Sequence, residues 1–245
     1  MSIRLLSADC REAMLNEGPF DCLIADPPYG DTSLGWDKRV IGWPEVAISR
    51  LKPTGSMWVF GSMRCFMETW SGFQSAGWRY AQEIIWEKHN GSGFQADRFK
   101  RVHEIAVQFY RADSPWSDVY NDVQKTHDAI KRSVPSKKAG PAHTGKIKQT
   151  AFASEDGGPR LMRSIIYMPS CHGHAIHPTE KPVGLLEILI RSSCPTGGLV
   201  GDFFAGSGAA GEACAHTGRR YVGTDSDSSM CDKARARLSA NLFAA

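Results

Sequence analysis

The segment Asp26-Pro27-Pro28-Tyr29 combines residue types that could bind a planar ring carrying an amino group. It directly follows the apolar run Cys22–Ala25, so its carboxylate stands at the carboxyl end of an expected strand, where open α/β sheets bind ligands. The two prolines stiffen the loop and lack N–H groups, so their carbonyl oxygens remain as acceptors beside the aromatic face of Tyr29. Asp-Pro-Pro is also a common loop terminator, so the motif taken alone leaves a structural role open.

A second motif, Gly206–Gly211, has the G-x-G-x-x-G spacing of nucleotide-binding turns. Its glycines allow a tight turn and a close approach of the backbone to a ligand. Asp225 follows Gly206 by 19 residues, at the end of the next expected strand, where an acid can bind ribose hydroxyls. An NAD-dependent oxidoreductase is therefore the first alternative, but too little chain follows Gly211 for a complete dinucleotide fold, and Asp26–Tyr29 would have no task.

The elements that must position these motifs are short apolar runs separated by segments of helical length. Strands are expected at Cys22–Ala25, Met57–Phe60, Leu199–Val200 and Tyr221–Gly223, and a further pair, which could be antiparallel, at Glu83–Trp86 and Glu104–Tyr110. Helices are expected at Trp43–Leu51, Pro182–Cys194, Ala209–Thr217 and Ser228–Leu242, with Pro182 in a first turn and Gly218 as a stop signal. The pattern predicts an α/β fold with a mostly parallel, twisted sheet and one antiparallel strand.

Composition excludes several classes of protein. The 245 residues, 42% hydrophobic and 22% charged, are ordinary for a globular protein with a real core. No stretch is long and apolar enough to span a bilayer, and the N-terminus lacks the apolar run of a signal peptide. Seven cysteines without a CxxC pair indicate reduced thiols. We therefore expect a cytoplasmic protein without membrane association.

The middle of the chain, from Ala112 to Arg163, has little apolar periodicity. Within Lys125–Lys148 there are seven basic residues and one acid, so this segment carries about +6 while the rest of the chain carries about −3. The net charge of +3 conceals this concentration. Composition alone fits a solvated surface loop as well as a surface that binds a polyanion.

The two motifs in this order resemble those of the β-class amino-methyltransferases of DNA, in which Asp-Pro-Pro-Tyr comes early and Phe-x-Gly-x-Gly comes late. Further matches are Asp9-Cys10, the segment His177–Pro182 and the strand Tyr221–Asp225, whereas Phe203 stands where the family usually has proline. The resemblance implies a Rossmann-like S-adenosylmethionine-dependent methyltransferase fold. It also implies site-specific transfer of a methyl group to N6 of an adenine flipped out of double-stranded DNA.

The resemblance also implies roles for individual residues. The Asp26 carboxylate and the Pro27 carbonyl would accept the two N–H bonds of the amine, Pro28 would complete the catalytic loop, and Tyr29 would stack on the base. The residues expected to bind S-adenosylmethionine are Asp9, Cys10, Asp26, Thr179, Lys181, Asp202, Phe204, Gly206, Ser207, Gly208 and Asp225. The residues expected to contact DNA phosphates are Lys125, Lys131, Arg132, Lys137, Lys138, Lys146 and Lys148.

This interpretation divides the chain into three parts. Residues 1–111 form the catalytic part of a methyltransferase domain, residues 112–164 an inserted basic target-recognition region, and residues 165–245 the cofactor-binding part of the same domain. Arg98, Lys100, Arg101 and His103 could extend the DNA-binding surface, and Trp36 could contact DNA. Cys171, His172, His174 and His177 lie close together in the sequence but lack a second ligand pair, so we expect no metal.

Alternatives remain open at this level. Cytosine-N4 methylation requires nearly the same geometry, although the family usually has serine at position 26 for that activity. More distant alternatives are methylation of RNA or of a protein amide, and a DNA-binding module without catalysis. Dimers are common in the family, so a homodimer is possible. The sequence identifies neither a recognition site nor a restriction endonuclease partner.

Overall fold

The computed structural model describes residues 2–92, 96–136, 151–171 and 173–242. The chain forms two compact units: a sheet unit, Met1–Asp122 with Ser164–Ala245, and an inserted unit, Val123–Arg163. Four of the residues expected to contact DNA, Lys137, Lys138, Lys146 and Lys148, lie outside the described residues, as does His172. In the described part, no helix is long and apolar enough to cross a membrane. All seven cysteines are free thiols.

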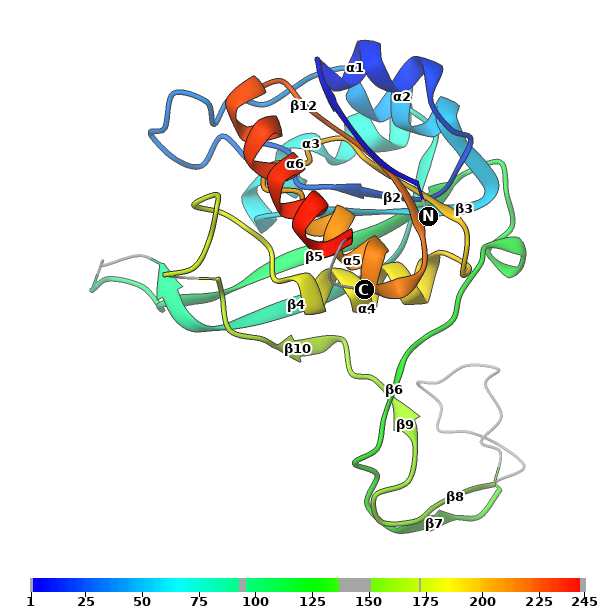
Figure 1. The fold of residues 1–245 in the computed structure, drawn as a ribbon. Coiled ribbons are helices and arrows are strands. Elements are labelled where there is room, and N and C mark those ends of the chain that lie inside the picture. The colour runs from blue at the N-terminus through cyan, green and yellow to red at the C-terminus, as the bar shows by residue number, and fades with distance from the viewer. Residues whose placement is uncertain (1, 93–95, 137–150, 172, 243–245) are drawn as a thin grey trace. The chain divides into compact units, whose positions relative to one another are not determined.

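The sheet unit is built on an eight-stranded sheet in the order β1-β12-β11-β2-β3-β5-β4-β10 (Figure 1). Its strands are β1 Ile3–Ser7, β2 Phe20–Ala25, β3 Leu51–Gly61, β4 Trp78–Ser92, β5 Arg101–Arg111, β10 Ile165–Tyr167, β11 Leu199–Asp202 and β12 Arg220–Asp225. The pairs β3–β5 and β4–β5 are antiparallel and the others are parallel, so β5 alone runs against the rest of this sheet. The expected α/β class, with one antiparallel strand, is confirmed.

The helices of this unit are α1 Cys10–Ala13, α2 Trp43–Arg50, α3 Met63–Ser75, α4 Val183–Ser193, α5 Ala209–Thr217 and α6 Ser228–Leu242, with single turns η1 Met14–Asn16 and η2 Trp116–Asp118. The four expected helices are present, with small shifts at their ends. Helix α2 ends at Arg50 because Leu51 already begins β3. Pro182 is the N-cap of α4 rather than a residue of its first turn, and Gly218 ends α5 in the left-handed conformation, as expected. Helices α1 and α3 were not predicted.

Helices cover both faces of the sheet. The side chains of β3 point alternately to one face and the other, and each set packs against helices. Met57 and Val59 point into a core shared with α1, α2 and α3. Trp58 points to the opposite face, where its indole N–H donates to Ser193 Oγ of α4 at 2.8 Å. Because both faces are buried, the strand reads as one continuous apolar run in the sequence.

The two chemical motifs follow neighbouring strands. β2 precedes Asp26–Tyr29 and β11 precedes the glycine turn, and the two strands pair in register, with Asp202 opposite Ile24. From β2 the chain continues to β3 on one side, and from β11 to β12 on the other, so the connections diverge between these strands. Ligands of open α/β sheets bind at such a switch point, at the carboxyl ends of the strands.

The inserted unit contains two small antiparallel ladders in its described part. Strand β6, Lys125–Thr126, pairs with β9, Arg160–Leu161, and β7, Arg132–Val134, pairs with β8, Phe152–Ser154. This unit begins at Val123, later than the expected residue 112. The residues before it pack on the sheet unit: the Trp116 ring lies 5.1 Å from that of Tyr110, and the Tyr120 amide donates to the Thr54 carbonyl at 2.9 Å.

Candidate active site

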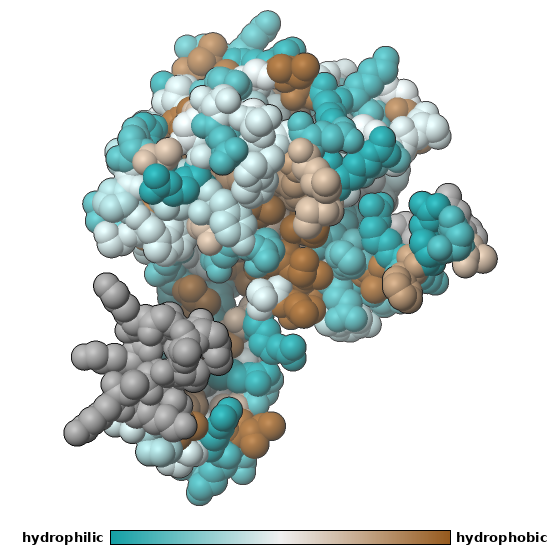
Figure 2. Space-filling model, turned by 180° about the vertical axis from the view of Figure 1, so that it is seen from behind, coloured by the Kyte–Doolittle hydropathy of each residue, from teal (hydrophilic) through white to brown (hydrophobic). Residues whose placement is uncertain are grey.

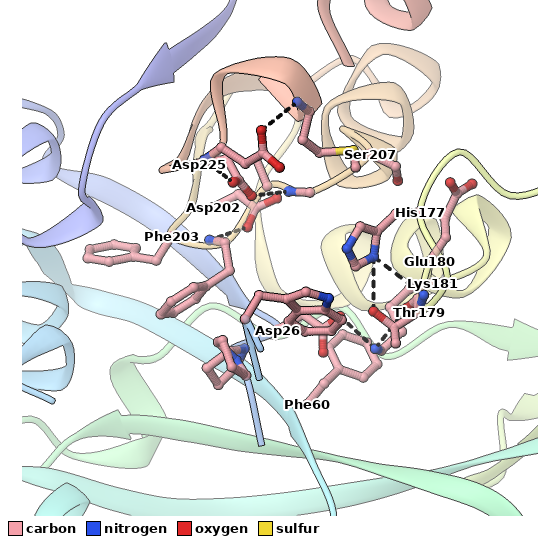
Figure 3. A pocket seen from close by; sticks show the side chains of 18 of the residues that line it. Asp26, Phe60, His177, Thr179, Glu180, Lys181, Asp202, Phe203, Ser207 and Asp225 are labelled. Atoms are coloured by element: carbon pink, nitrogen blue, oxygen red, sulfur yellow. Dashed lines mark hydrogen bonds and ion pairs between the residues drawn. The ribbon is translucent and has the colours of Figure 1, made fainter. Parts of the chain in front are cut away.

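A cavity of about 480 Å³ opens at the carboxyl edge of the parallel strands (Figure 3). The loops that follow β1, β2, β11 and β12 line it, together with the segment 177–181. The expected catalytic and cofactor-binding residues that line it are Asp9, Cys10, Asp26, Pro27, Pro28, Tyr29, Thr179, Lys181, Asp202, Phe204, Gly206, Ser207 and Asp225. The early and late motifs therefore meet in one cavity. Of the residues expected to be catalytic or to bind the cofactor, Gly208 does not line the cavity.

Gly206 and Gly208 of the glycine turn both have left-handed backbone conformations, but their surroundings differ. Gly206 has φ +48°, and a Cβ added there would meet no atom within 4 Å, so the missing side chain leaves open space beside the cavity. Gly208 has φ +76°, and a Cβ there would lie 3.1 Å from Ala234 Cβ of α6. Gly206 therefore lets a ligand approach the backbone, whereas Gly208 lets α5 pack against α6.

Carboxylates gather at the glycine-turn end of the cavity. Asp225 Oδ2 accepts from the Gly206 amide at 2.9 Å, and Asp9 caps α1 by accepting from the Arg11 amide at 2.8 Å. The side chain of Arg11 also bonds Asp9 and lowers the pKa of that carboxyl. Acids with acceptor capacity to spare, beside a glycine backbone, fit a cationic ligand that carries neighbouring hydroxyl groups.

Asp202 is the most deeply buried of these acids, with 3% of its surface exposed. Its carboxylate accepts from the Phe204 amide at 3.1 Å and from the Tyr221 hydroxyl at 3.0 Å. Burial raises the pKa of Asp202 to about 7, and these two hydrogen bonds oppose the shift without cancelling it. Asp202 thus links the end of β11 to the neighbouring strand β12.

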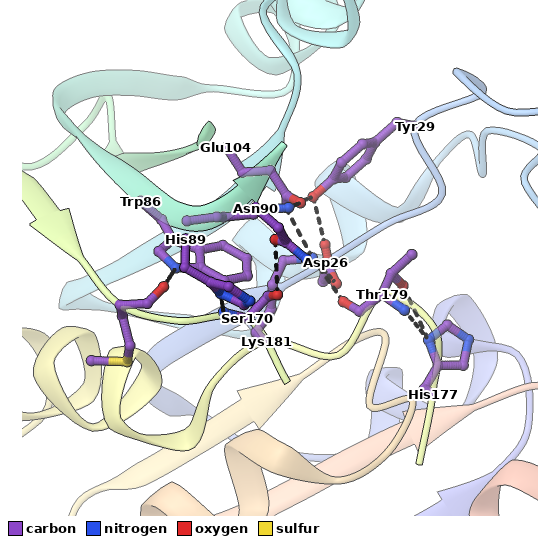
Figure 4. A network of polar contacts seen from close by, with 12 residues as sticks. Asp26, Tyr29, Trp86, His89, Asn90, Glu104, Ser170, His177, Thr179 and Lys181 are labelled. Carbon is purple, nitrogen blue, oxygen red and sulfur yellow. Dashed lines mark hydrogen bonds and ion pairs between the residues drawn. The ribbon is translucent and has the colours of Figure 1, made fainter. Parts of the chain in front are cut away.

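At the other end of the cavity, two donors fix the carboxylate of Asp26 (Figure 4). The Tyr29 hydroxyl donates to Oδ1 at 2.8 Å, and the Lys181 ammonium donates to Oδ2 at 2.6 Å. The same ammonium lies 5.6 Å from the centre of the Tyr29 ring and 5.2 Å from that of Phe60. Lys181, which was expected to bind the cofactor, therefore contacts the catalytic motif directly.

Glu104 on β5 completes this network, although no motif in the sequence singles it out. Its carboxylate lies 3.3 Å from both the Tyr29 hydroxyl and the Lys181 ammonium, and it also pairs with Lys88 of β4. Burial opposes ionisation, but Lys181 and Lys88 lower the pKa of Glu104 to about 2. The one signal in the sequence is its place at the start of the expected strand Glu104–Tyr110, ahead of the apolar residues Ile105–Val107.

Lys181 is charged in spite of its burial, with 5% of its surface exposed. Burial by itself lowers the pKa of a lysine, but the carboxylates of Asp26 and Glu104 reverse the effect and raise the pKa of Lys181 above its ordinary value. Lys181 and Glu104 thus form a partly buried ion pair that stays charged near neutral pH, and Asp26 accepts from the same ammonium.

Arg237 of α6 ties the segment before α4 to the glycine turn. Its guanidinium donates to Glu180 Oε1 at 2.9 Å and to Ser207 Oγ at 3.3 Å, and it also pairs with Glu212 of α5. The second oxygen of Glu180 accepts from the Ile176 amide at 3.0 Å. These bonds hold the loop that carries Thr179 and Lys181 against the cavity.

The loop after Tyr29 forms one wall of the cavity. Asp37, buried in this loop, accepts from the amides of Gly30 at 2.8 Å and Thr32 at 2.7 Å. Trp36, 47% exposed, lines the cavity with its ring 5.4 Å from the ring of His177. Four other tryptophans are buried in the core: Trp43, Trp58, Trp78 and Trp86.

The described residues among those expected to contact DNA phosphates are not in the lining of this cavity. Lys125, Lys131 and Arg132 belong to the inserted unit, where Lys131 pairs with Glu155 at 3.2 Å. In the part of the chain that the structure describes, no three His, Cys, Asp or Glu side chains gather as metal ligands would.

The chain is similar to known DNA methylases at three levels. Residues 20–236 match the family model N6_N4_Mtase, described as DNA methylase. The Type II methyltransferase M2.DpnII of Streptococcus pneumoniae is 26% identical in an alignment of 245 positions. The alignment covers 90% of this chain and 82% of that protein.

Two solved structures share the fold. One is the M1.HpyAVI–SAM complex, with a TM-score of 0.66, 22% identity, and coverage of 96% of this chain and 100% of that one. The other is the PvuII DNA methyltransferase (cytosine-N4-specific), with a TM-score of 0.64, 13% identity, and coverage of 97% and 86%. These similarities confirm the expected Rossmann-like methyltransferase fold.

Proposed function

Because the chain belongs to the N6/N4 DNA methylase family, we propose that it is a β-class enzyme that methylates N6 of adenine in double-stranded DNA, with S-adenosylmethionine as donor. The observation that carries this proposal is the position of Asp26. It stands, held by Lys181 and Tyr29, in the same cavity as the glycine turn and Asp225. An acceptor for an amine and a site for a cationic nucleoside thus share one space.

The cofactor end of the cavity fits the donor. When bound, S-adenosylmethionine supplies a methyl group on a sulfonium, a good leaving group. Asp225 would accept from ribose hydroxyls, the open space beside Gly206 would admit the ligand close to the backbone, and Asp202, Phe204 and Ser207 would hold the methionine portion. Asp9 and Cys10 would border the adenine of the cofactor, and Thr179 would lie near its methionine portion.

The catalytic end positions the target amine. The lone pair of an adenine amine is delocalised into the ring, so the amine is a poor nucleophile. The Asp26 carboxylate and the Pro27 carbonyl accept hydrogen bonds from the two N–H groups of this amine. This arrangement directs its lone pair toward the donor methyl group. Tyr29 stacks on the flipped base with one ring face, while the Lys181 ammonium lies over the ring from the network side.

Lys181 and Glu104 contribute fixed charges to this step rather than proton transfer. The pKa of Glu104 is about 2 and that of Lys181 is above its ordinary value, so neither exchanges a proton near neutral pH. Lys181 holds the Asp26 carboxylate in place, and Glu104 pairs with both Lys181 and Lys88, so that two ammonium groups face two carboxylates. The proton released from the amine passes to water.

The choice of base rests on residue 26. The PvuII enzyme, a cytosine-N4 methyltransferase, has the same fold, so the fold does not discriminate between the two bases. Asp26 favours adenine, because β-class cytosine-N4 enzymes usually have serine there. Cytosine-N4 methylation is the alternative, and modification-sensitive sequencing of DNA from cells expressing the protein distinguishes the two and reports the recognition site.

The inserted unit contributes DNA binding in this proposal. It contains nine basic and three acidic residues, a suitable charge for phosphate contacts that do not depend on base sequence. Residues 1–111 and 165–245 then form one methyltransferase domain interrupted by a target-recognition region.

The replacement Asp26→Asn tests the mechanism. Asn keeps one acceptor oxygen but loses the charge, so methyl transfer from labelled S-adenosylmethionine to DNA should fall by about a hundredfold or more. The affinity for S-adenosylmethionine should change little, because the cofactor binds mainly at the other end of the cavity. A folded Asp26→Asn protein with wild-type activity contradicts the mechanism.

A further inference from the structure

A second cavity, of about 150 Å³, lies next to the candidate active site. It is lined by Ser62, Met63 and Arg64 at the start of α3, by Arg101, His103 and Ile105 of β5, and by Gly61, Tyr29 and Glu104. Tyr29 and Glu104 also line the first cavity, so the two spaces share a wall. We call this second space the α3 pocket.

The α3 pocket offers donors for an anion from two independent elements. Arg101 and His103 are exposed side chains of β5, and Arg64 is an exposed side chain of α3. At the start of α3, Ser62 satisfies the Cys65 amide with its hydroxyl and the Phe66 amide with its carbonyl. Within the described residues, no acceptor is found for the amides of Met63 and Arg64, which start a helix of 13 residues.

The carboxylate in the pocket wall does not oppose an anion. Glu104 pairs with Lys181 at 3.3 Å and with Lys88, so its charge is already balanced inside the network. The nearest pairing of Arg64 is a weak contact with Glu68 of the same helix at 3.3 Å, and 72% of the Arg64 side chain is exposed. The guanidinium groups of Arg64 and Arg101 therefore remain available to a ligand.

We propose that the α3 pocket binds one backbone phosphate of the target strand, next to the flipped nucleotide. This rests on the proposed function, since a base stacked on Tyr29 brings its own phosphodiester to the far side of the same wall. A phosphate fits because its charge and oxygens match two guanidinium groups, an imidazole and free helix amides. The sheet unit thus holds the target strand itself, in addition to any contact made by the inserted unit.

The surroundings of the pocket support a nucleic acid as the ligand. Beyond Arg101 the hairpin of β4 and β5 continues to Arg98, Phe99 and Lys100, all exposed, with the Phe99 side chain fully so. Seen from behind, the projecting end of this hairpin, at the right-hand edge of Figure 2, has strongly hydrophilic residues beside a few apolar ones. Cations beside an exposed aromatic ring suit a nucleic acid better than a small free anion.

The test uses duplexes that contain the recognition site found by sequencing, each with one neutral methylphosphonate near the target base. For the wild-type protein, one flanking position should weaken DNA binding by about tenfold or more, because the charge that assists the hydrogen bonds is removed. The double variant Arg64→Gln/Arg101→Gln should bind unmodified DNA with a similar reduction in affinity. Its affinity should fall by less than about a further twofold when the same phosphate is neutral, because both changes remove one interaction.

Arg79→Gln is the matched control. Arg79 is an exposed residue at the opposite end of β4, so its replacement should leave the full methylphosphonate effect. Thermal unfolding and S-adenosylmethionine affinity, expected to be unchanged in every variant, check the fold. The proposal is overturned if the methylphosphonate weakens binding by the double variant as much as it weakens binding by the wild-type protein. It is also overturned if no flanking methylphosphonate weakens DNA binding by the wild-type protein. Methyl transfer to unmodified DNA is measured in parallel, and its absence counts against the proposed function instead.

Discussion

In the proposed mechanism the carboxylate of Asp26 accepts hydrogen bonds from the target amine, and its neighbours already fix its orientation. Lys181 donates to one of its oxygens and Tyr29 to the other, and each oxygen has a further lone pair for the target amine. Because these contacts exist before any base enters, the acceptor needs little rearrangement at the moment of reaction.

Lys181→Met should lower kcat by about a hundredfold or more, because Asp26 loses the ammonium that fixes it. S-adenosylmethionine affinity should change by only a few fold, and Lys181→Arg should restore part of the activity. Steady-state kinetics and equilibrium cofactor binding check this. Lys52→Met is the matched control, since Lys52 pairs with Asp21, which is not part of the cavity.

A second variant separates catalysis from stability. Lys181→Met leaves the two partly buried carboxylates, Asp26 and Glu104, without a shared cation, so it should also destabilise the protein. Lys181→Met/Glu104→Gln removes one of these charges, so its stability should recover while its activity stays low. If the double variant regained wild-type kcat, Lys181 would have only a structural role.

Among the strands and helices, the direction of each strand decides which residues meet. The parallel strands β2 and β11 deliver their following loops to one edge, which brings Asp26 to the glycine turn. β5 runs the other way, so its first residues, not its last, lie at this edge. That is why Glu104, near the start of β5, reaches Lys181.

Stability should depend on pH through Asp202, which connects the ends of β11 and β12. The pKa of Asp202 is about 7 in the folded protein, well above the ordinary value of about 3.8 expected when unfolded. The unfolded state therefore releases the proton first, and the free energy of unfolding should fall as pH rises from about 4 to 7, by up to about 1.4 kcal/mol per pH unit.

The free energy of unfolding of Asp202→Asn should not show this fall between about pH 4 and 7. Urea unfolding of both proteins between about pH 5 and 8 measures it, because the other titrating groups are common to both. The variant should gain stability relative to wild type as pH rises to about 7, and the difference should then level off. Parallel pH profiles would contradict a raised pKa at Asp202.

Helix α6 should stabilise the loop beside the cavity through Arg237. Arg237→Met leaves Glu180, 4% exposed, without its cation, so the free energy of unfolding should fall by about 3 kcal/mol and S-adenosylmethionine affinity should weaken. Arg235→Met on the same helix is the control, since Arg235 makes an exposed pair with Asp232 and should have little effect. Equal reductions in both variants would refute the role of Arg237.

Across the molecule, the charge is divided unequally between the two units. The inserted unit carries about +6 and the sheet unit about −3, although the chain as a whole has a net charge of +3. A polyanion is thus attracted mainly by the insertion, while the acidic cavity suits a cationic cofactor.

Neutralising the insertion should therefore affect DNA binding and spare cofactor binding. Replacing its seven predicted phosphate-binding residues, Lys125 to Lys148, with glutamine should make the negative slope of log affinity against log salt shallower by about 0.9 for each phosphate that the protein no longer neutralises. S-adenosylmethionine affinity should be unchanged. Titrations at several salt concentrations check this, and an unchanged slope would show that the insertion does not bind phosphates.

Short stretches of sequence were sufficient to predict the fold class and the family. Apolar runs of strand length, separated by helical segments, predicted the parallel sheet, and the residue types of the two motifs led to the proposal of an acceptor loop and a nucleotide-binding turn. These signals are local, because a strand's periodicity and a glycine's conformational freedom belong to a few consecutive residues.

The contacts between the side chains of the site, in contrast, could be identified only from the tertiary structure. Lys181 and Asp26 are 155 residues apart, and Glu104 is 75 residues from Tyr29, yet all four form one network. Gly208, which the motif predicts to bind the cofactor, is not in the cavity lining and packs against α6. Such contacts depend on strand order and on the reversed direction of β5, which no short stretch of sequence encodes, so the partners of a recognisable catalytic residue become visible only once the chain is folded.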